Sequence, residues 1–251
     1  MELTAQMFWI VCPLAFLAGF VDSIAGGGGL ISLPAYYLAG LPPALASGTN
    51  KLAAGMGTSL ATYHYARAGR IDMRVGGPAA IGAFVCSAAG ALLLRQLPPD
   101  LARWLVMGCI PVAAVFTLYR GKVNAPKRQL RAGWFWAFLI GCGVGFYDGL
   151  IGPGTGTFLI LFFIHLFQME EVMSSGTAKV VNLSSNVAAF LSLLATGEVM
   201  VWLGLPAGGC AMLGAFLGSK LTIKKGGKVV RGMIFVVLAL LFAKILWDMV
   251  S

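Results

Sequence analysis

The chain has 251 residues, of which 59% are hydrophobic and 11% are charged, and its formal net charge is +9 at pH 7. In a typical soluble domain about a quarter of all residues are charged. The low charged fraction, together with a mean hydropathy of +0.86, therefore excludes an ordinary water-soluble protein. Of the 18 basic residues, 13 occur in three short connections, a pattern that fixes membrane topology and argues against nucleic acid as a partner.

Apolar segments follow one another along the whole chain and predict an all-α polytopic integral membrane protein. The first half is expected to form helices at 7–25, 29–40, 44–66, 75–94 and 102–120. The second half is expected to form helices at 131–151, 155–168, 173–195, 199–220 and 229–249. The first of these segments is not a cleavable signal peptide, because residues 1–6 carry no positive charge and no small-residue cleavage site follows.

The two halves of the chain resemble each other. The run Gly19-Phe20-Val21-Asp22-Ser23-Ile24-Ala25-Gly26-Gly27-Gly28 returns 126 positions later as Gly145-Phe146-Tyr147-Asp148-Gly149-Leu150-Ile151-Gly152-Pro153-Gly154. The run Gly48-Thr49-Asn50-Lys51 returns 128 positions later as Gly176-Thr177-Ala178-Lys179. We therefore predict a first transmembrane repeat at 1–124 and a second at 125–251, which together form one transmembrane domain. Matched halves with glycine-broken segments are typical of transporters whose substrate path lies between the halves.

The three basic connections predict the topology of these repeats. Their basic residues lie at 67–74, 120–131 and 220–231. One choice of orientation places all three connections in the cytoplasm with both termini outside. Each half has an odd number of segments, so the second half enters the membrane upside down relative to the first. This is an inverted-topology arrangement.

The glycine-rich stretch of each half is expected to be the tip of a re-entrant or discontinuous helical hairpin. Residues 29–40 would span only about 18 Å as a helix, which is well short of a hydrocarbon core of about 30 Å. Backbone amides at such a tip are a natural anion site. The glycine-tip residues assigned to substrate binding are Gly26, Gly27, Gly28, Gly29, Gly152, Gly154 and Thr155. The alternative is that glycines only permit close helix packing, which we favour for Gly19, Gly55, Gly90 and Gly218.

Two matched charged pairs are the strongest candidates for function. Lys51 and Lys179 lie about 10 Å into predicted crossings that descend from opposite faces, so both are expected near the midplane, where charge is costly unless it is paired or serves a ligand. We assign both lysines to the substrate. Asp22 and Asp148 could pair with these lysines, cap backbone amides or accept protons during coupling, and spacing alone does not separate these roles.

Polar side chains near the lysines complete the predicted site. Thr49 and Asn50 precede the first lysine, while Asn182 and Asn186 follow the second on its own helix face. These four residues are expected to orient an oxyanion, and Ser184 and Ser185 are left undecided. The sequence contains no metal-ligand cluster, nucleophile–base signature or nucleotide-binding loop, so it predicts no metal or cofactor and supports neither an enzyme nor an ATP-driven pump.

The run Gly19-Phe20-Val21-Asp22-Ser23-Ile24-Ala25-Gly26-Gly27-Gly28-Gly29-Leu30-Ile31-Ser32-Leu33-Pro34, followed by Gly48-Thr49-Asn50-Lys51, closely resembles the sulfite exporter TauE/SafE family, also called the toluene sulfonate uptake permease family. The second half carries a degenerate copy of this motif. The resemblance implies a carrier of sulfite, sulfoacetate, thiosulfate or sulfonates in a bacterial or archaeal inner membrane. It supports the class of protein better than the substrate.

The sequence therefore predicts a secondary transporter, an exporter of small sulfur-containing oxyanions or organosulfonates that works by alternating access around a central anion site. A passive anion channel and a non-transporting membrane scaffold remain the alternatives. The expected partners are a small anionic substrate and the lipid bilayer, with proton coupling and a homodimer left open.

Overall fold

The computed structural model describes residues 3–98, 101, 133–230, 232–233 and 236, and regular structure within these ranges is helical. The helices, in chain order, are α1 (Ala5–Ala25), α2 (Gly29–Leu38), α3 (Pro43–Arg67), α4 (Met73–Gln96), α6 (Gly133–Leu150), α7 (Thr155–Phe167), α8 (Glu171–Ala195) and α9 (Val201–Lys225). The segment expected at 102–120, the 120–131 connection, the repeat boundary at 124/125 and most of 229–249 lie outside the described residues.

The all-α polytopic fold predicted from hydropathy is confirmed. Four of the described helices, α1, α4, α8 and α9, are long and apolar enough to cross a membrane. Helix α3 is as long as α8 but more polar. This polarity is tolerated because α3 packs among α2, α8 and α9, and a helix surrounded by protein does not need an apolar surface on every side.

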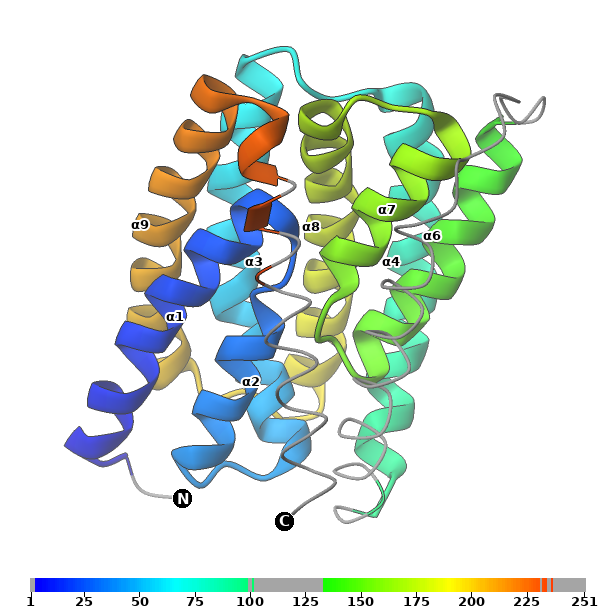
Figure 1. The fold of residues 1–251 in the computed structure, drawn as a ribbon. Helices are drawn as coiled ribbons and strands as arrows, with labels where there is room; N and C mark the ends of the chain where they lie inside the picture. Colours follow the sequence, from blue (N-terminus) through cyan, green and yellow to red (C-terminus); the bar gives the residue numbers. More distant parts are fainter. Residues whose placement is uncertain (1–2, 99–100, 102–132, 231, 234–235, 237–251) are drawn as a thin grey trace, which may run out of the picture.

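Two helical hairpins enter the bundle from opposite ends (Figure 1). Helices α1 and α2 form one hairpin, which returns to the end from which it enters, and α6 and α7 form the other. Their tips meet inside the molecule, where the backbone of Gly26 lies directly against that of Gly156. Helix α2 has 10 residues and α7 has 13, which give lengths of only about 15 and 20 Å. The two short helices therefore do not cross the membrane, and each hairpin tip lies within the bundle. Irregular backbone at this depth must be surrounded by protein, because lipid cannot satisfy its polar groups.

Packing between the helices repeats the internal sequence similarity. Helix α1 packs against α9 as α6 packs against α4, and α3 packs against α9 as α8 packs against α4. The closest approaches also match, since Gly19 lies against the Ala211 backbone of α9 while Gly145 lies against the Ala83 backbone of α4. Each hairpin thus packs mainly on a long helix of the other half, so the two halves are interlocked.

The C-terminal end of α1 lies at the tip of its hairpin, where Ser23, Ile24 and Ala25 are buried. The final four C=O groups of a helix have no partner within it, and here side chains from α3, α7 and α8 donate to all four. Lys179 Nζ donates to the Asp22 carbonyl, Tyr65 Oη to Ser23, Ser175 Oγ to Ile24 and Thr157 Oγ1 to Ala25. The tip of the first hairpin is therefore fixed by the helices around it.

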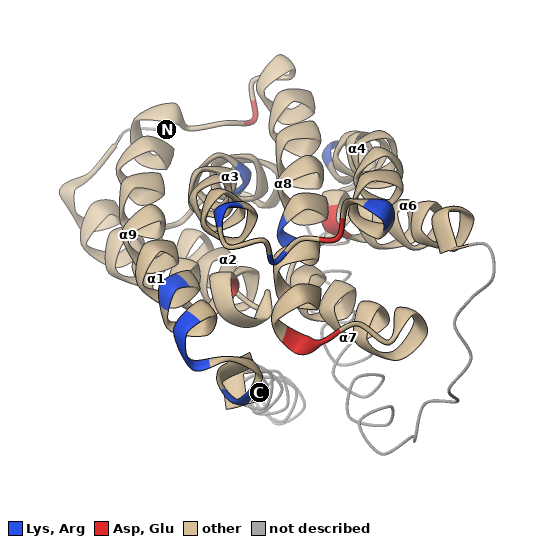
Figure 2. Cartoon of the chain, turned by 90° about the horizontal axis from the view of Figure 1, so that it is seen from above, with Lys and Arg blue, Asp and Glu red and all other residues tan. Residues whose placement is uncertain are grey.

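The basic residues of two connections gather at one end of the bundle. The end of α3, the following turn, the start of α4 and the end of α9 lie together there (Figure 1), and Figure 2 shows Lys and Arg at these positions. Arg67, Arg70, Arg74, Lys224 and Lys225 belong to this group. Two of the three basic connections expected to share a membrane side thus share one end of the molecule.

Candidate functional site

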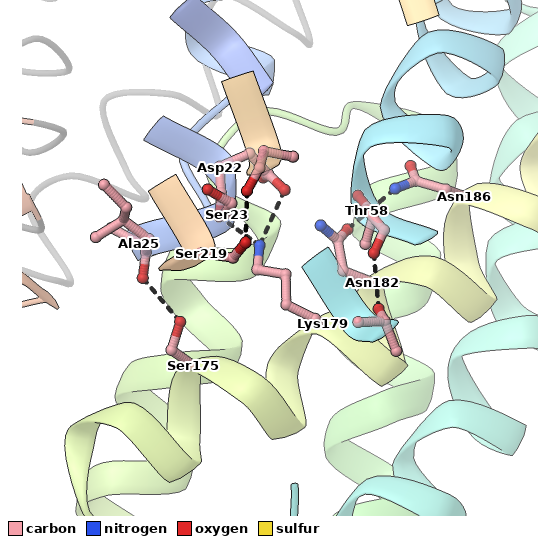
Figure 3. Close-up of polar contacts among 12 residues, drawn as sticks. Asp22, Ser23, Ala25, Thr58, Ser175, Lys179, Asn182, Asn186 and Ser219 are labelled. Atoms are coloured by element: carbon pink, nitrogen blue, oxygen red, sulfur yellow. Dashed lines mark hydrogen bonds and ion pairs between the residues drawn. The ribbon is translucent and has the colours of Figure 1, made fainter. Parts of the chain in front are cut away.

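Two buried ion pairs join the halves of the chain. Lys51 on α3 contacts Asp148 on α6, with Nζ 2.6 Å from Oδ2, and both side chains are only 3% exposed. Lys179 on α8 contacts Asp22 on α1, with Nζ 2.9 Å from Oδ2. Figure 3 shows Lys179 reaching the end of α1 beside Asn182 and Asn186. Each lysine therefore pairs with the aspartate of the other half.

The two carboxylates differ in their surroundings. Asp148 also accepts hydrogen bonds from Thr155 Oγ1 to Oδ1 and from Ser185 Oγ to Oδ2, both at 2.7 Å. Asp22 retains 18% side-chain exposure in its pair with Lys179. Asp148 is thus enclosed by three side-chain donors, whereas Asp22 is the more accessible of the two acids.

A cavity of about 20 Å³, which we call the central cavity, lies where the hairpin tips meet. This volume holds about one or two water molecules. Most of the residues predicted from the sequence line it, and Ala54 and Gly156 complete its wall. The predicted residues among the lining are Asp22, Gly26, Gly29, Asn50, Lys51, Asp148, Gly152, Thr155, Asn182 and Asn186. The structure thereby brings together groups from both glycine-rich tips and from helices α3 and α8.

The other predicted site residues have different surroundings. Gly28 lines an adjoining cavity, while Gly27, Thr49, Gly154 and Lys179 line neither of the two cavities. Lys179 is fully buried, and it donates to both the side chain and the backbone of Asp22. Ser185, which the sequence left undecided, lies against Asp148. Its place between Ser184 and Asn186 gave no sign of that partner.

Thr49 and its repeat counterpart Thr177 have matching backbone contacts. The Thr49 hydroxyl accepts from the Met200 N–H at 3.0 Å, and the Thr177 hydroxyl accepts from the Asp72 N–H at 2.9 Å. Met200 and Asp72 are the residues that precede α9 and α4. These hydroxyls therefore satisfy amide groups at helix starts, where the helix itself supplies no acceptor.

Replacing Thr49 by Val is expected to lower the free energy of unfolding by about 1 kcal/mol, because the Met200 amide loses its acceptor. Thr177→Val should have the same effect through Asp72. Thermal unfolding of purified protein measures the loss, and substrate half-saturation should stay unchanged in both variants. A raised half-saturation in Thr49→Val alone would instead assign Thr49 to the substrate.

No group of three His, Cys, Asp or Glu side chains suited to a metal ion occurs in the ranges that the structure describes. The charged groups at the tips are instead balanced, two lysines against two aspartates. Polar groups of this kind within a bundle of membrane-crossing helices mark a path for ions or polar solutes.

Fold and site together define a multi-pass membrane transporter, and comparison with known proteins agrees. Residues 11–245 match the family model described as sulfite exporter TauE/SafE. The chain belongs to this family.

Curated relatives have the same class of name. The chain is 32% identical to a "Probable membrane transporter protein" of Haemophilus influenzae, over 99% of this chain and 98% of the relative. It is 37% identical to the "Probable membrane transporter protein YfcA" of Escherichia coli, over 98% of this chain and 94% of that one. No solved structure matches the chain.

Proposed function

We propose that the protein is a secondary transporter that exports small sulfur-containing oxyanions or organosulfonates, such as sulfite, sulfoacetate or thiosulfate. The observation that carries this proposal is the pair of crossed ion pairs at the meeting point of two hairpin tips. The family name supports the sulfur chemistry, and the residues support an anionic ligand. The protein would lie in a bacterial or archaeal inner membrane, with its basic connections in the cytoplasm and both termini outside.

The site has donors for an oxyanion, but its resting charge is balanced. Lys51 and the amides of the glycine tips suit the oxygens of a sulfite or sulfonate group, since ammonium and backbone N–H donors bind such anions well. Asn50, Asn182 and Asn186 add side-chain amides to the same wall. Because Lys51 is already ion-paired with Asp148, the substrate must compete with an internal carboxylate. Binding of the anion therefore loosens a contact that holds the two halves together.

This competition supports alternating access. The central cavity holds about one or two waters, so a sulfonate can enter only if the tips move apart. When the anion replaces Asp148 as the partner of Lys51, the half that carries the aspartate is released from the half that carries the lysine. Rocking of one half against the other would then expose the anion on the opposite side.

The membrane potential gives the direction. With the inside negative, it favours anion efflux by about 2.3 kcal/mol per charge per 100 mV, so export needs no nucleotide. A proton-coupled mode is the second candidate, and the exposure of Asp22 favours it. Protonation of Asp22 would release Lys179 from its carboxylate partner, and the proton and a monovalent anion together would leave the net charge of the site unchanged.

The proposal predicts saturable uptake of radiolabelled sulfite into proteoliposomes under an imposed potential, positive inside. The variant Lys51→Met/Asp148→Leu should lose at least about 90% of this flux, because it removes one ion pair without leaving a buried unpaired charge. The matched control is Arg70→Ala/Glu170→Ala, whose side chains form an exposed pair, 46% and 51% accessible, at the end of the bundle. This control should transport normally.

Each alternative has its own outcome in the same assay. A passive channel would give flux without saturation and without counterflow of labelled against unlabelled sulfite. A non-transporting scaffold would give no flux with sulfite, thiosulfate or sulfoacetate in the folded wild type. Equal flux in wild type and Lys51→Met/Asp148→Leu would refute the lysine site. A pH gradient that drives uptake without a potential would establish the proton-coupled mode, and Asp22→Asn should abolish that response.

A further inference from the structure

A second cavity, which we call the side cavity, adjoins the central cavity. It has a volume of about 30 Å³ and lies between α1, α2 and α3. Asp22, Gly29, Asn50 and Ala54 line both cavities. The two spaces therefore share a wall.

The side cavity has a largely apolar wall with two unsatisfied polar atoms. Small residues such as Ala18, Gly19 and Ala53 form much of its surface. The hydroxyl of Tyr36 and Oδ1 of Asn50 have no hydrogen-bond partner, although Tyr36 is 0% exposed and Asn50 only 5%. Buried polar atoms are nearly always paired. These two therefore point to a polar group that occupies the cavity.

The second half of the chain has no counterpart of these two groups. The position equivalent to Asn50 in the second half is Ala178, and the stretch of α7 equivalent to Tyr36 carries Phe162, Phe163 and Ile164. The backbone contacts of Thr49 and Thr177, in contrast, match between the two halves. Tyr36 and Asn50 thus belong to one half only, as expected for a ligand that binds in one orientation.

We propose that the side cavity binds the uncharged part of the transported anion, and that the substrate is a short hydroxyalkyl sulfonate. This inference rests on the proposed function, because the sulfonate head would lie at Lys51 in the central cavity. A hydroxyl group can accept from Tyr36 Oη and donate to Asn50 Oδ1. The alanine and glycine wall suits a carbon chain between these two ends, and 30 Å³ admits about two or three water-sized groups. Tyr36 is thereby a specificity-determining residue.

The test compares 2-hydroxyethanesulfonate, ethanesulfonate and sulfite as ligands of the purified full-length protein. Half-saturation of the ligand-induced thermal shift gives binding without relying on transport. Wild type should bind 2-hydroxyethanesulfonate about tenfold more tightly than ethanesulfonate, because the analogue leaves Tyr36 and Asn50 unpaired. In Tyr36→Phe this ratio should fall to about one, while sulfite binding stays within about twofold of wild type.

Folding of the variant is not at risk, because Tyr36→Phe removes a hydroxyl that has no partner in the protein. The control is Tyr37→Phe, since Tyr37 is the neighbouring tyrosine on α2 but lines neither cavity. It should keep the wild-type tenfold ratio. Equal binding of the two sulfonates by wild type, or an unchanged ratio in Tyr36→Phe, overturns the subsite and leaves water as the occupant.

The same measurements keep this inference separate from the proposed function. Sulfite flux that depends on Lys51 and Asp148, together with equal binding of both sulfonates, would refute the subsite alone. Selective binding of 2-hydroxyethanesulfonate without flux of any of the three anions would refute transport and support the subsite. The absence of both binding and flux would refute the subsite and the proposed function together.

Discussion

Replacing Asp148 by Leu while Lys51 is kept is expected to lower the free energy of unfolding by about 3 to 5 kcal/mol. The reason is that Lys51, only 3% exposed, would lose its carboxylate partner, while the other acid of the central cavity, Asp22, is already paired with Lys179. The double variant Lys51→Met/Asp148→Leu should recover most of this loss, to within about 2 kcal/mol of wild type, since neither charge is then left buried. Ser185 and Thr155 lose their carboxylate acceptor, but each hydroxyl can donate instead to a backbone carbonyl within reach, that of Asn182 or Gly152.

A double-mutant cycle measured by SDS titration in mixed micelles gives the coupling energy of the pair. The exposed pair Arg70–Glu170, with a 3.7 Å separation, serves as the comparison and should give a coupling below about 1 kcal/mol. If Lys51 and Asp148 show no more coupling than this exposed pair, the buried contact does not hold the halves together, and the proposed competition by substrate fails with it.

Replacing Gly26 by Ala is expected to be the most damaging single methyl addition in the described structure. Gly26 has φ of +77°, and a Cβ there would overlap the backbone of Gly156 at the opposite tip. The strained conformation and the overlap together should cost about 3 to 5 kcal/mol. Because the tips carry the proposed site, flux should fall as well, even in the fraction that remains folded.

Two other glycines separate the causes of this effect. Gly69 has φ of +65° but nothing within 4 Å of its Cβ position, so Gly69→Ala measures conformational strain alone and should cost about 1 to 2 kcal/mol. Gly77 lies within α4 with open space around it, and Gly77→Ala should leave stability unchanged or raise it slightly. A Gly26→Ala variant no worse than Gly69→Ala would show that the hairpin tips do not touch as described.

The fold could be predicted from the sequence because its strongest signals are local. Helix bounds follow from apolar runs, and α1, at Ala5–Ala25, lies within two residues of the expected 7–25. The close packing expected at Gly19, Gly90 and Gly218 is confirmed by backbone atoms that leave no room for a Cβ. Gly55 is different, because its Cβ position meets only Asn186, at 3.9 Å.

The candidate site could be predicted only in part, because partners depend on how the halves interlock. The motif placed Lys51 and Asp148 near the centre, yet spacing gave no reason to pair a lysine with the aspartate of the other half. Thr49 illustrates the same limit, since its bond to Met200 spans 151 positions. Tyr36 carried no sequence signal, since an aromatic residue in an apolar helix is ordinary. Only its unpaired hydroxyl in the packed structure distinguishes it.

The exchange of partners between halves also affects how the protein is made. Lys51 is synthesised 97 residues before Asp148, and Asp22 is synthesised 157 residues before Lys179. At about 5 to 20 residues per second, the charges of the first half wait roughly 5 to 30 s for their partners. During this interval a nascent chain with an unpaired lysine and an unpaired acid must be held by the insertion machinery or neutralised by a proton. Slower translation of the second half should therefore expose the first half to membrane proteases for longer.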